Sequence, residues 1–302
     1  MRIIFMGTPA FAVPSLEALA SNHEVIAVFT RPDAVRSRGR ALEPSPVKVR
    51  AEELGIPVCE CSRISPDEIA AMRELAPDLI AVAAYGAILP DPMLDIAPKG
   101  CINVHASLLP RWRGASPIQA AILNGDTVSG VTIMQMDPGI DTGPMLKARE
   151  LPIESYDTTV TLSAKMADLA AELLIEVIPD YAAGRLLPQP QPEEGACYTG
   201  MISKADGMLD FTQSAEALVC KVHAYNPWPC AMFEIDGETF KVYQAHAVNN
   251  KEGLTPGTRT VEKGLPAIAA ADGLLALDEL QAPGKKAMPG KAFLAGYRKW
   301  QV

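Results

Sequence analysis

Three polar side chains in the middle of the chain have the types and the spacing of a proton-transfer site. Asn103 and His105 are two residues apart in the apolar run 101–105, and Asp141 lies in a turn at 137–144 that is rich in glycine and proline. An imidazole can take up or give a proton, a carboxylate can orient it and balance its charge, and an amide can donate to an oxyanion. The three residues together therefore predict a site that stabilises a negatively charged intermediate.

Two predicted strands have to position these side chains. Residues 101–105 predict a short buried strand, in which Asn103 and His105 share a face because side chains alternate between the two faces. Residues 131–136 predict a second strand, and the turn that follows it carries Asp141. In open α/β sheets, ligands lie beyond the carboxyl ends of the strands, so we expect the three side chains to meet there. The residues alone leave a second interpretation open, since buried histidines are mostly satisfied core residues and aspartates in such turns mostly form the turn.

The segments around these residues closely resemble the formyltransferase family that uses 10-formyltetrahydrofolate. The resemblance rests on Asn-Val-His-Ala-Ser-Leu-Leu-Pro at 103–110, Arg-Gly at 113–114, Pro-Ile-Gln at 117–119 and Asp-Pro-Gly-Ile-Asp-Thr-Gly at 137–143. It implies that Asn103, His105 and Asp141 are the catalytic residues. Asn103 and a protonated His105 would stabilise the oxyanion, and Asp141 would hold His105 and raise its pKa.

The resemblance also implies which residues line the folate site. They are Ser107, Leu108, Leu109 and Pro110 in one loop, and Tyr85, Gly86, Ile88 and Leu89 in another. The second loop follows residues 78–84, a near-continuous apolar run of the kind that is buried in parallel sheets. An apolar loop with an aromatic residue is suited to hold a flat ring. The expected co-substrate is 10-formyltetrahydrofolate, and no metal is expected.

A basic segment at 31–42 is the candidate contact for a nucleic acid. It contains Arg31, Arg36, Arg38 and Arg40 and has no apolar period. From the residues alone it is either a solvated loop or a finger that binds phosphates, which arginine does in a bidentate way. The N-terminal residues Gly7-Thr8-Pro9, Phe11 and Val13-Pro14 resemble the branch of the family that formylates methionyl initiator tRNA. In that branch a basic loop at this position contacts the acceptor stem, which makes initiator methionyl-tRNA the expected partner.

The order of strands and helices predicts the fold and its division. Strands and helices alternate to about residue 184, which is typical of a doubly wound, mostly parallel α/β sheet. A proline-rich stretch at 188–195 follows, and the short strands after it suggest a smaller C-terminal β-barrel, of the oligonucleotide-binding type by resemblance. We therefore expect a catalytic, folate-binding domain at 1–187, a linker at 188–204 and a tRNA-binding β-barrel at 205–302.

Composition limits the alternatives. The net charge of −9 argues against a general nucleic-acid coat but allows a local basic patch. Six cysteines without a disulfide or zinc pattern fit a reducing cytoplasm, and no apolar run is long enough to span a membrane. We expect a cytoplasmic monomer with no membrane attachment.

Other acceptors of the formyl group remain open from the sequence. The main alternative is a formyltransferase that acts on an amino-sugar nucleotide, although such enzymes usually lack the arginine segment. Glycinamide ribonucleotide and water are further alternatives, as is an RNA-binding protein without catalysis. The C-terminal region argues against glycinamide ribonucleotide as the acceptor. The complete Asn, His and Asp set argues against an RNA-binding protein without catalysis.

Overall fold

The structure, a computed structural model, describes residues 1–34 and 42–300. The chain divides into two compact units. Unit 1 comprises residues 1–117, 128–152 and 163–199, and unit 2 comprises residues 118–127, 153–162 and 200–302. Each unit is described here by itself.

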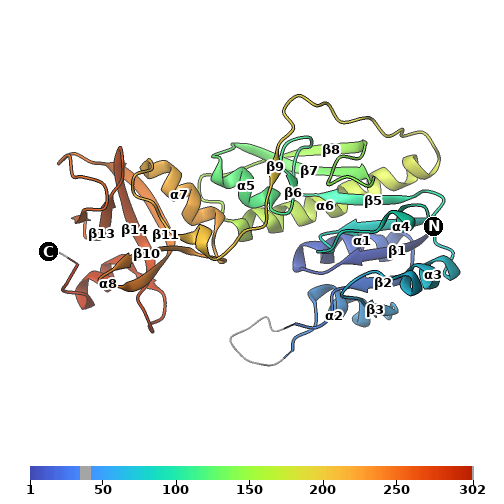
Figure 1. Ribbon diagram of the computed structural model, residues 1–302, viewed down its shortest axis with the longest axis horizontal. Helices are drawn as coiled ribbons and strands as arrows, with labels where there is room; N and C mark the ends of the chain where they lie inside the picture. Colours follow the sequence, from blue (N-terminus) through green and yellow to red (C-terminus); the bar gives the residue numbers. More distant parts are fainter. Residues whose placement is uncertain (35–41, 301–302) are drawn as a thin grey trace. The chain divides into compact units, whose positions relative to one another are not determined.

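A seven-stranded sheet, in the order β3-β2-β1-β4-β5-β7-β8, forms the centre of unit 1 (Figure 1). Its strands are β1 (Arg2–Gly7), β2 (Glu24–Thr30), β3 (Val58–Glu60), β4 (Leu79–Ala83), β5 (Cys101–His105), β7 (Val128–Gln135) and β8 (Met145–Pro152). The strands from β3 to β5 pair in parallel, whereas β7 pairs antiparallel with both β5 and β8. The predicted mostly parallel sheet is therefore confirmed, with β7 as the strand that runs the other way.

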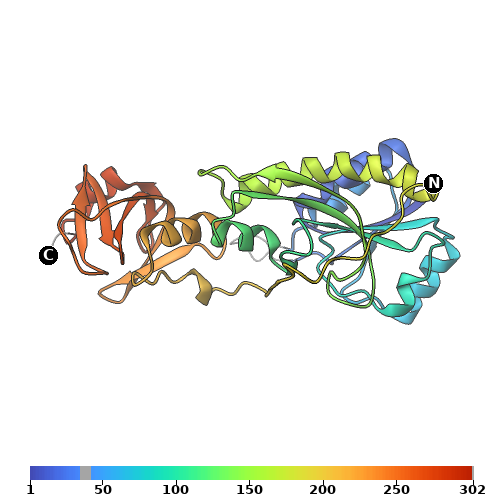
Figure 2. The same ribbon diagram turned by 90° about the horizontal axis from the view of Figure 1, so that it is seen from above.

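Helices cover both faces of this sheet, and most of them have a proline in their first turn, where proline favours helix initiation. They are α1 (Val13–Asn22), α2 (Pro46–Glu53), α3 (Pro66–Glu74), α4 (Asp91–Leu94) and α6 (Thr159–Ala182). Figure 2 shows α1 and α6 on one face and α3 on the other. Ser65 forms a capping box with Glu68 at the start of α3, as the sequence predicts for an N-cap residue. Along α6, apolar side chains such as Leu162, Met166 and Leu173 are fully buried at helical spacing.

Unit 2 is built on an antiparallel six-stranded sheet. Its elements are α5 (Pro117–Leu123), α7 (Ala215–Ala224), β10 (Ala231–Ile235), β11 (Glu238–Asn249), β12 (Arg259–Glu262), β13 (Leu265–Ala269), β14 (Gly273–Gln281), β15 (Met288–Pro289) and α8 (Gly290–Gly296). Its core contains Phe233, Phe240, Phe293 and Trp300, whose rings meet in stacked and edge-on pairs. The predicted second domain of short β-strands is confirmed.

The proline-rich segment after α6 is docked on unit 1 as far as residue 199. Gln189 exchanges two backbone hydrogen bonds with Met145, of 2.7 and 2.8 Å. Further along, β9 (Tyr198–Thr199) pairs in parallel with β6 (Arg113–Gly114). We call residues 191–199 the strap. The proline pattern predicts its extended backbone, but it does not predict the hydrogen bonds that attach the segment to β8 and β6.

Within residues 1–34 and 42–300, no helix has the length and the apolar content needed to cross a membrane.

Candidate active site

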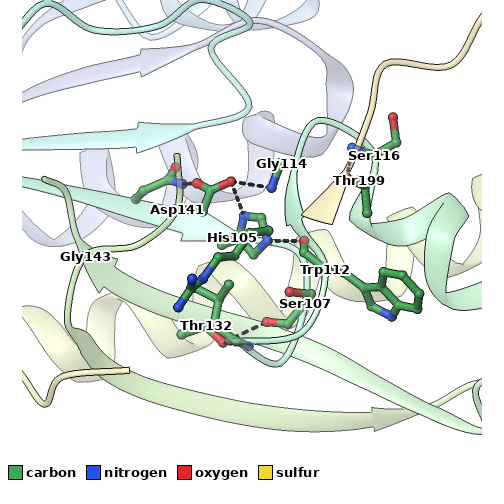
Figure 3. A network of polar contacts seen from close by, with 12 residues as sticks. His105, Ser107, Trp112, Gly114, Ser116, Thr132, Asp141, Gly143 and Thr199 are labelled. Carbon is green, nitrogen blue, oxygen red and sulfur yellow. Dashed lines mark hydrogen bonds and ion pairs between the residues drawn. The ribbon is translucent and has the colours of Figure 1, made fainter. Parts of the chain in front are cut away.

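The three residues singled out in the sequence meet in unit 1. Asn103 and His105 are two residues apart on β5 and so share a face of the strand. Asp141 reaches His105 from the loop between β7 and β8 (Figure 3). The Asn103 amide Nδ2 donates to Asp141 Oδ1 at 3.4 Å, and the other oxygen, Oδ2, lies 3.6 Å from His105 Nδ1. The Gly114 backbone N–H also donates to Oδ2, at 2.8 Å. One carboxylate therefore contacts the amide, the imidazole and a backbone donor.

Asp141 reaches this position through a route that the sequence does not predict. Because β7 runs antiparallel to β5, its carboxyl end at Gln135 pairs with Ile102 near the start of β5. The expected meeting of neighbouring carboxyl ends is therefore wrong for this pair, and the loop has to fold back to bring Asp141 to His105. Asp137 stabilises the loop by accepting from Thr142 Oγ1 at 2.8 Å and from Gly139 N at 3.1 Å.

A glycine allows this loop to close against the sheet. A side chain on Gly143 would collide with the Gln135 carbonyl oxygen, so only glycine fits between β7 and the returning chain. Asp141 itself has a left-handed backbone with a φ of +53°, which Asp adopts more readily than most residues. The glycine and proline content of the turn thus has a direct structural reason.

The hydrogen bonds of His105 define its tautomer. Its Nε2 lies 3.0 Å from the Trp112 carbonyl oxygen, which can only accept, so Nε2 carries the proton. The other nitrogen, Nδ1, faces the Asp141 carboxylate and is the atom that takes up a second proton. The side chain of His105 is only 5% exposed, which keeps this nitrogen away from bulk water.

Burial decides the charge of His105 in the resting protein. Desolvation lowers the pKa of His105 below the usual histidine value, and this effect outweighs the charge of Asp141 and the hydrogen bond to Trp112, both of which raise it. The lowered pKa favours a neutral ring that can accept a proton, and Asp141 raises the pKa of His105 and so favours the protonated ring once it forms.

We expect the His105 ring to titrate below pH 6.5, and its pKa to fall further in Asp141→Asn because that change removes the charge favouring the protonated ring. An NMR titration of the ring C–H resonances measures both values, with His105→Gln used to assign the signal. A midpoint above 6.5 in the unmodified protein, or no downward shift in the variant, would contradict this assignment of burial and charge.

The loop at 107–110 is attached to β7 through Thr132. Thr132 Oγ1 donates to the Ser107 carbonyl oxygen at 2.7 Å and accepts from Leu109 N at 3.2 Å. Ser107 Oγ donates to the Arg111 carbonyl oxygen at 2.6 Å, so its hydroxyl is part of the loop itself. Ser107 and Leu109 are buried, whereas Leu108 and Pro110 are half-buried.

The loop at 85–89 presents one apolar side chain. Tyr85 is buried in the core, where its hydroxyl donates to the Cys61 carbonyl oxygen at 3.4 Å, and Leu89 is buried as well. Thr8 Oγ1 donates to the Tyr85 carbonyl oxygen at 2.8 Å and so connects this loop to the turn after β1. Gly86 is exposed, and the Ile88 side chain is 86% exposed.

Only the edges of the arginine segment fall within the described residues. Arg31 donates to the Ser62 carbonyl oxygen, and its backbone N–H donates to Thr8 Oγ1 at 3.3 Å. Ala34 and Glu43 exchange backbone hydrogen bonds of 3.2 and 3.0 Å, which close the base of the segment. Arg36, Arg38 and Arg40 lie outside the described residues.

The sequence did not point to the residues of β6 and the strap that support Asp141 and its loop. Gly114 donates to Asp141, and the buried Arg113 contacts Gln191 of the strap, whose amide contacts the Asp141 loop. Arg113 and Gly114 stand within a segment that carried the family resemblance, so that segment was the available signal. Nothing in the proline-rich segment marked Gln191.

Among the described residues, no group of three or more His, Cys, Asp and Glu side chains is placed to hold a metal ion.

Comparison with known proteins agrees with this fold. The sequence profile described as Formyl transferase matches residues 1–178, and the profile described as Formyl transferase, C-terminal domain, matches residues 201–298. The chain therefore belongs to the formyl transferase family, which confirms the resemblance found in the sequence.

Within that family, the similar full-length proteins are methionyl-tRNA formyltransferases. The chain is 44% identical to that of Xylella fastidiosa strain 9a5c and 47% identical to that of Stenotrophomonas maltophilia strain K279a. Both matches cover 100% of this chain and 99% of the relative.

Solved structures share the fold at lower sequence identity. An N-formyltransferase from Helicobacter canadensis, in complex with folinic acid and dTDP-3-aminofucose, is 20% identical with a TM-score of 0.70 and covers 91% of this chain and 98% of its own. HypX from Aquifex aeolicus, in complex with tetrahydrofolic acid, is 18% identical with a TM-score of 0.65 and covers 100% of this chain and 48% of its own.

Proposed function

We propose that this protein transfers the formyl group of 10-formyltetrahydrofolate to the α-amino group of methionine on initiator tRNA, for translation initiation. The observation that carries the proposal is the contact of one carboxylate, Asp141, with both Asn103 and His105 at the end of β5. The identity to methionyl-tRNA formyltransferases over the whole chain supports this acceptor more than an amino-sugar nucleotide.

The loops around the trio fit a flat, partly apolar donor. Ile88 is 86% exposed on the loop after β4, Ile140 is 57% exposed on the loop after β7, and Leu108 is half-buried after β5. Apolar side chains form most of the lining of small-molecule sites, and these three are available to contact a ligand. We propose that two loops line the folate site, with Tyr85 and Leu89 behind its surface and Ile88 and Leu108 at the surface. The other predicted residues of these loops are Gly86, Ser107, Leu109 and Pro110.

In the proposed reaction, His105 moves the proton and Asn103 stabilises the developing charge. The methionyl nitrogen forms a bond to the formyl carbon, and the formyl oxygen becomes negative. Asn103 has a second amide hydrogen to donate to this oxygen while the first contacts Asp141. His105 Nδ1 takes up the proton that the attacking amine loses, and Asp141 stabilises the resulting imidazolium. His105 then returns that proton to N10 as the bond from the formyl carbon to N10 breaks.

The remaining parts of the chain supply the tRNA contacts in this proposal. We propose residues 1–187 as the catalytic, folate-binding domain, 188–204 as the linker and 205–302 as the tRNA-binding domain. Arg31, Arg36, Arg38 and Arg40 would bind phosphates of the acceptor stem. All six cysteines are free, which supports a reducing compartment, and we propose that the protein acts in the cytoplasm as a monomer.

The decisive experiment measures formyl transfer from 10-formyltetrahydrofolate to two acceptors in parallel: methionyl initiator tRNA and a dTDP-linked amino sugar. Formyl-methionine on the tRNA supports the proposal. Transfer only to the sugar nucleotide, or only to water, would keep the folate chemistry and overturn the acceptor.

The arginine segment gives a second, separable result. We expect replacement of Arg31, Arg36, Arg38 and Arg40 by alanine to lower kcat/KM for the tRNA by at least about tenfold and to weaken its salt dependence, because each phosphate contact contributes to the salt slope. The matched control replaces four exposed basic residues of unit 1 that have no assigned contact with tRNA or folate, Arg2, Arg73, Lys147 and Arg185. If the two sets had equal effects, total charge and not the arginine segment would govern tRNA binding.

A further inference from the structure

One side chain of the strap is attached to the backbone on both sides of the catalytic turn. Gln191 Nε2 donates to the carbonyl oxygen of Asp141 at 2.8 Å and to that of Gly143 at 2.7 Å. The donors of a single amide thus bind two carbonyl groups that flank Thr142. Two backbone carbonyl oxygens cannot hydrogen-bond to each other, because both are acceptors. The Gln191 amide therefore supplies the donors that hold these two carbonyls together.

A buried guanidinium fixes which way the Gln191 amide points. Arg113 is 4% exposed, and its Nε donates to Gln191 Oε1 at 3.0 Å. Guanidinium can only donate, so the oxygen of the amide has to face Arg113 and the NH₂ has to face the two carbonyls. Arg113 also donates to the Tyr198 hydroxyl at 3.1 Å and lies 5.6 Å from the Tyr198 ring centroid, which anchors it to the far end of the strap.

The strap also supports the carboxylate of Asp141 through β6. Arg113 N donates to the Cys197 carbonyl oxygen at 2.9 Å, and Ser116 N donates to Thr199 Oγ1 at 2.9 Å. Between these two attachments lies Gly114, whose N–H donates to Asp141 Oδ2. The strap therefore holds the backbone of Asp141 directly and its carboxylate through one intervening residue.

We infer that Gln191 is a positioning residue for the transfer reaction: it aligns Asp141 with His105 and Asn103, and the strap is thereby a structural part of the catalytic centre. This inference rests on the proposed function, because it assigns Gln191 a role in the chemistry of Asp141. The alternative is that Gln191 only stabilises the fold, which the experiments below distinguish.

Gln191→Glu separates the two contacts of the amide. A carboxylate still accepts from Arg113, but it cannot donate to the two carbonyls and instead repels them. We expect kcat to fall about 10- to 30-fold, with KM for both substrates within about threefold, because misplacement of a catalytic group mainly affects the chemical step. Gln189→Glu is the matched control, since it makes the same change two residues earlier on an exposed side chain. A Gln191→Glu enzyme with kcat within about twofold of Gln189→Glu would overturn the inference.

A double-mutant cycle with Asp141→Asn tests whether Gln191 acts through Asp141. If it does, Gln191→Glu costs about threefold or less in the Asp141→Asn background, because residues that act as a unit are not additive. A merely structural role would cost the same factor in both backgrounds, and that result would contradict the inference.

We call the contacts of Gln191 with the Asp141 and Gly143 carbonyls the clamp. Amide hydrogen exchange tests the clamp without any assay of activity. We expect the peptide that spans residues 137–145 to exchange at least about tenfold faster in Gln191→Glu than in Gln189→Glu, because the first change releases the turn. Equal exchange in the two variants would overturn the clamp whichever acceptor the enzyme uses. Conversely, absence of formyl transfer to methionyl-tRNA by the unmodified protein would overturn the proposed function. The clamp would then still be tested by the hydrogen exchange of residues 137–145.

Discussion

Replacing His105 or Asn103 with alanine should lower kcat by about 10²–10³, in the range usual for removing a general base or an oxyanion donor. In the proposed reaction His105 accepts the proton of the attacking amine, and Asn103 is the amide that shares Asp141 with it. The measurement is steady-state formyl transfer at saturating methionyl-tRNA. Binding of the tRNA should change little, because both side chains act on the reacting atoms.

The chain contains a matched control for the histidine. His246 in unit 2 also faces a carboxylate, with its Nδ1 2.7 Å from Asp278 Oδ2, but its side chain is 50% exposed. We expect His246→Ala to leave kcat within about twofold, because an exposed pair of this kind contributes little. A His105→Ala enzyme that retained near-normal turnover would show that His105 is a core residue and that the catalytic assignment is wrong.

Gly114→Ala should lower kcat by at least about 10²-fold, the loss that follows from displacing a catalytic group by about 1 Å. A β-carbon at Gly114 would collide with the Thr199 carbonyl oxygen, so β6 has to move away from β9. That movement takes the Gly114 N–H away from Asp141 Oδ2, now 2.8 Å from it. The carboxylate then loses the backbone donor that orients it toward His105.

Gly184→Ala, outside the strap, separates this collision from backbone strain. Both glycines have positive φ, +105° at Gly114 and +71° at Gly184, so both substitutions strain the backbone by about 1 kcal/mol or more. Around Gly184, however, nothing lies within 4 Å of the added carbon. Kinetics and melting temperatures of both variants make the comparison. Equal kcat values would mean that strain, and not the placement of Asp141, accounts for any loss.

The parts of this structure that were predictable are those that leave a local pattern. The apolar run with alternating polar side chains predicted β5 and the shared face of Asn103 and His105. The helical spacing of Leu162, Met166 and Leu173 along α6 and the N-cap residue Ser65 at the start of α3 are local patterns of the same kind. These features depend on residues that are close in the sequence, so periodicity and capping residues record them.

The parts that were not predictable depend on contacts between distant residues. Apolar alternation does not record strand direction, so the antiparallel course of β7 was missed, and with it the return of the Asp141 loop. Gln191 and Arg113 are 78 residues apart in the chain, and a single hydrogen bond between them leaves no pattern in either segment. The charge of His105 depends on how deeply β5 buries it, which its neighbours in the sequence do not specify.

The course of the strap also decides where related enzymes could be recombined. A junction at residue 187 lies before Gln191 and β9, although the proline-rich sequence makes it look like a natural boundary. A chimera joined there would take its clamp from the donor of the C-terminal region and its Asp141 loop from the other parent. The turnover of the chimera should then be higher when the Gln191 contacts of one parent fit the Asp141 loop of the other. A junction after Thr199 keeps the loop and the clamp from one parent and exchanges only unit 2 residues from 200 onward.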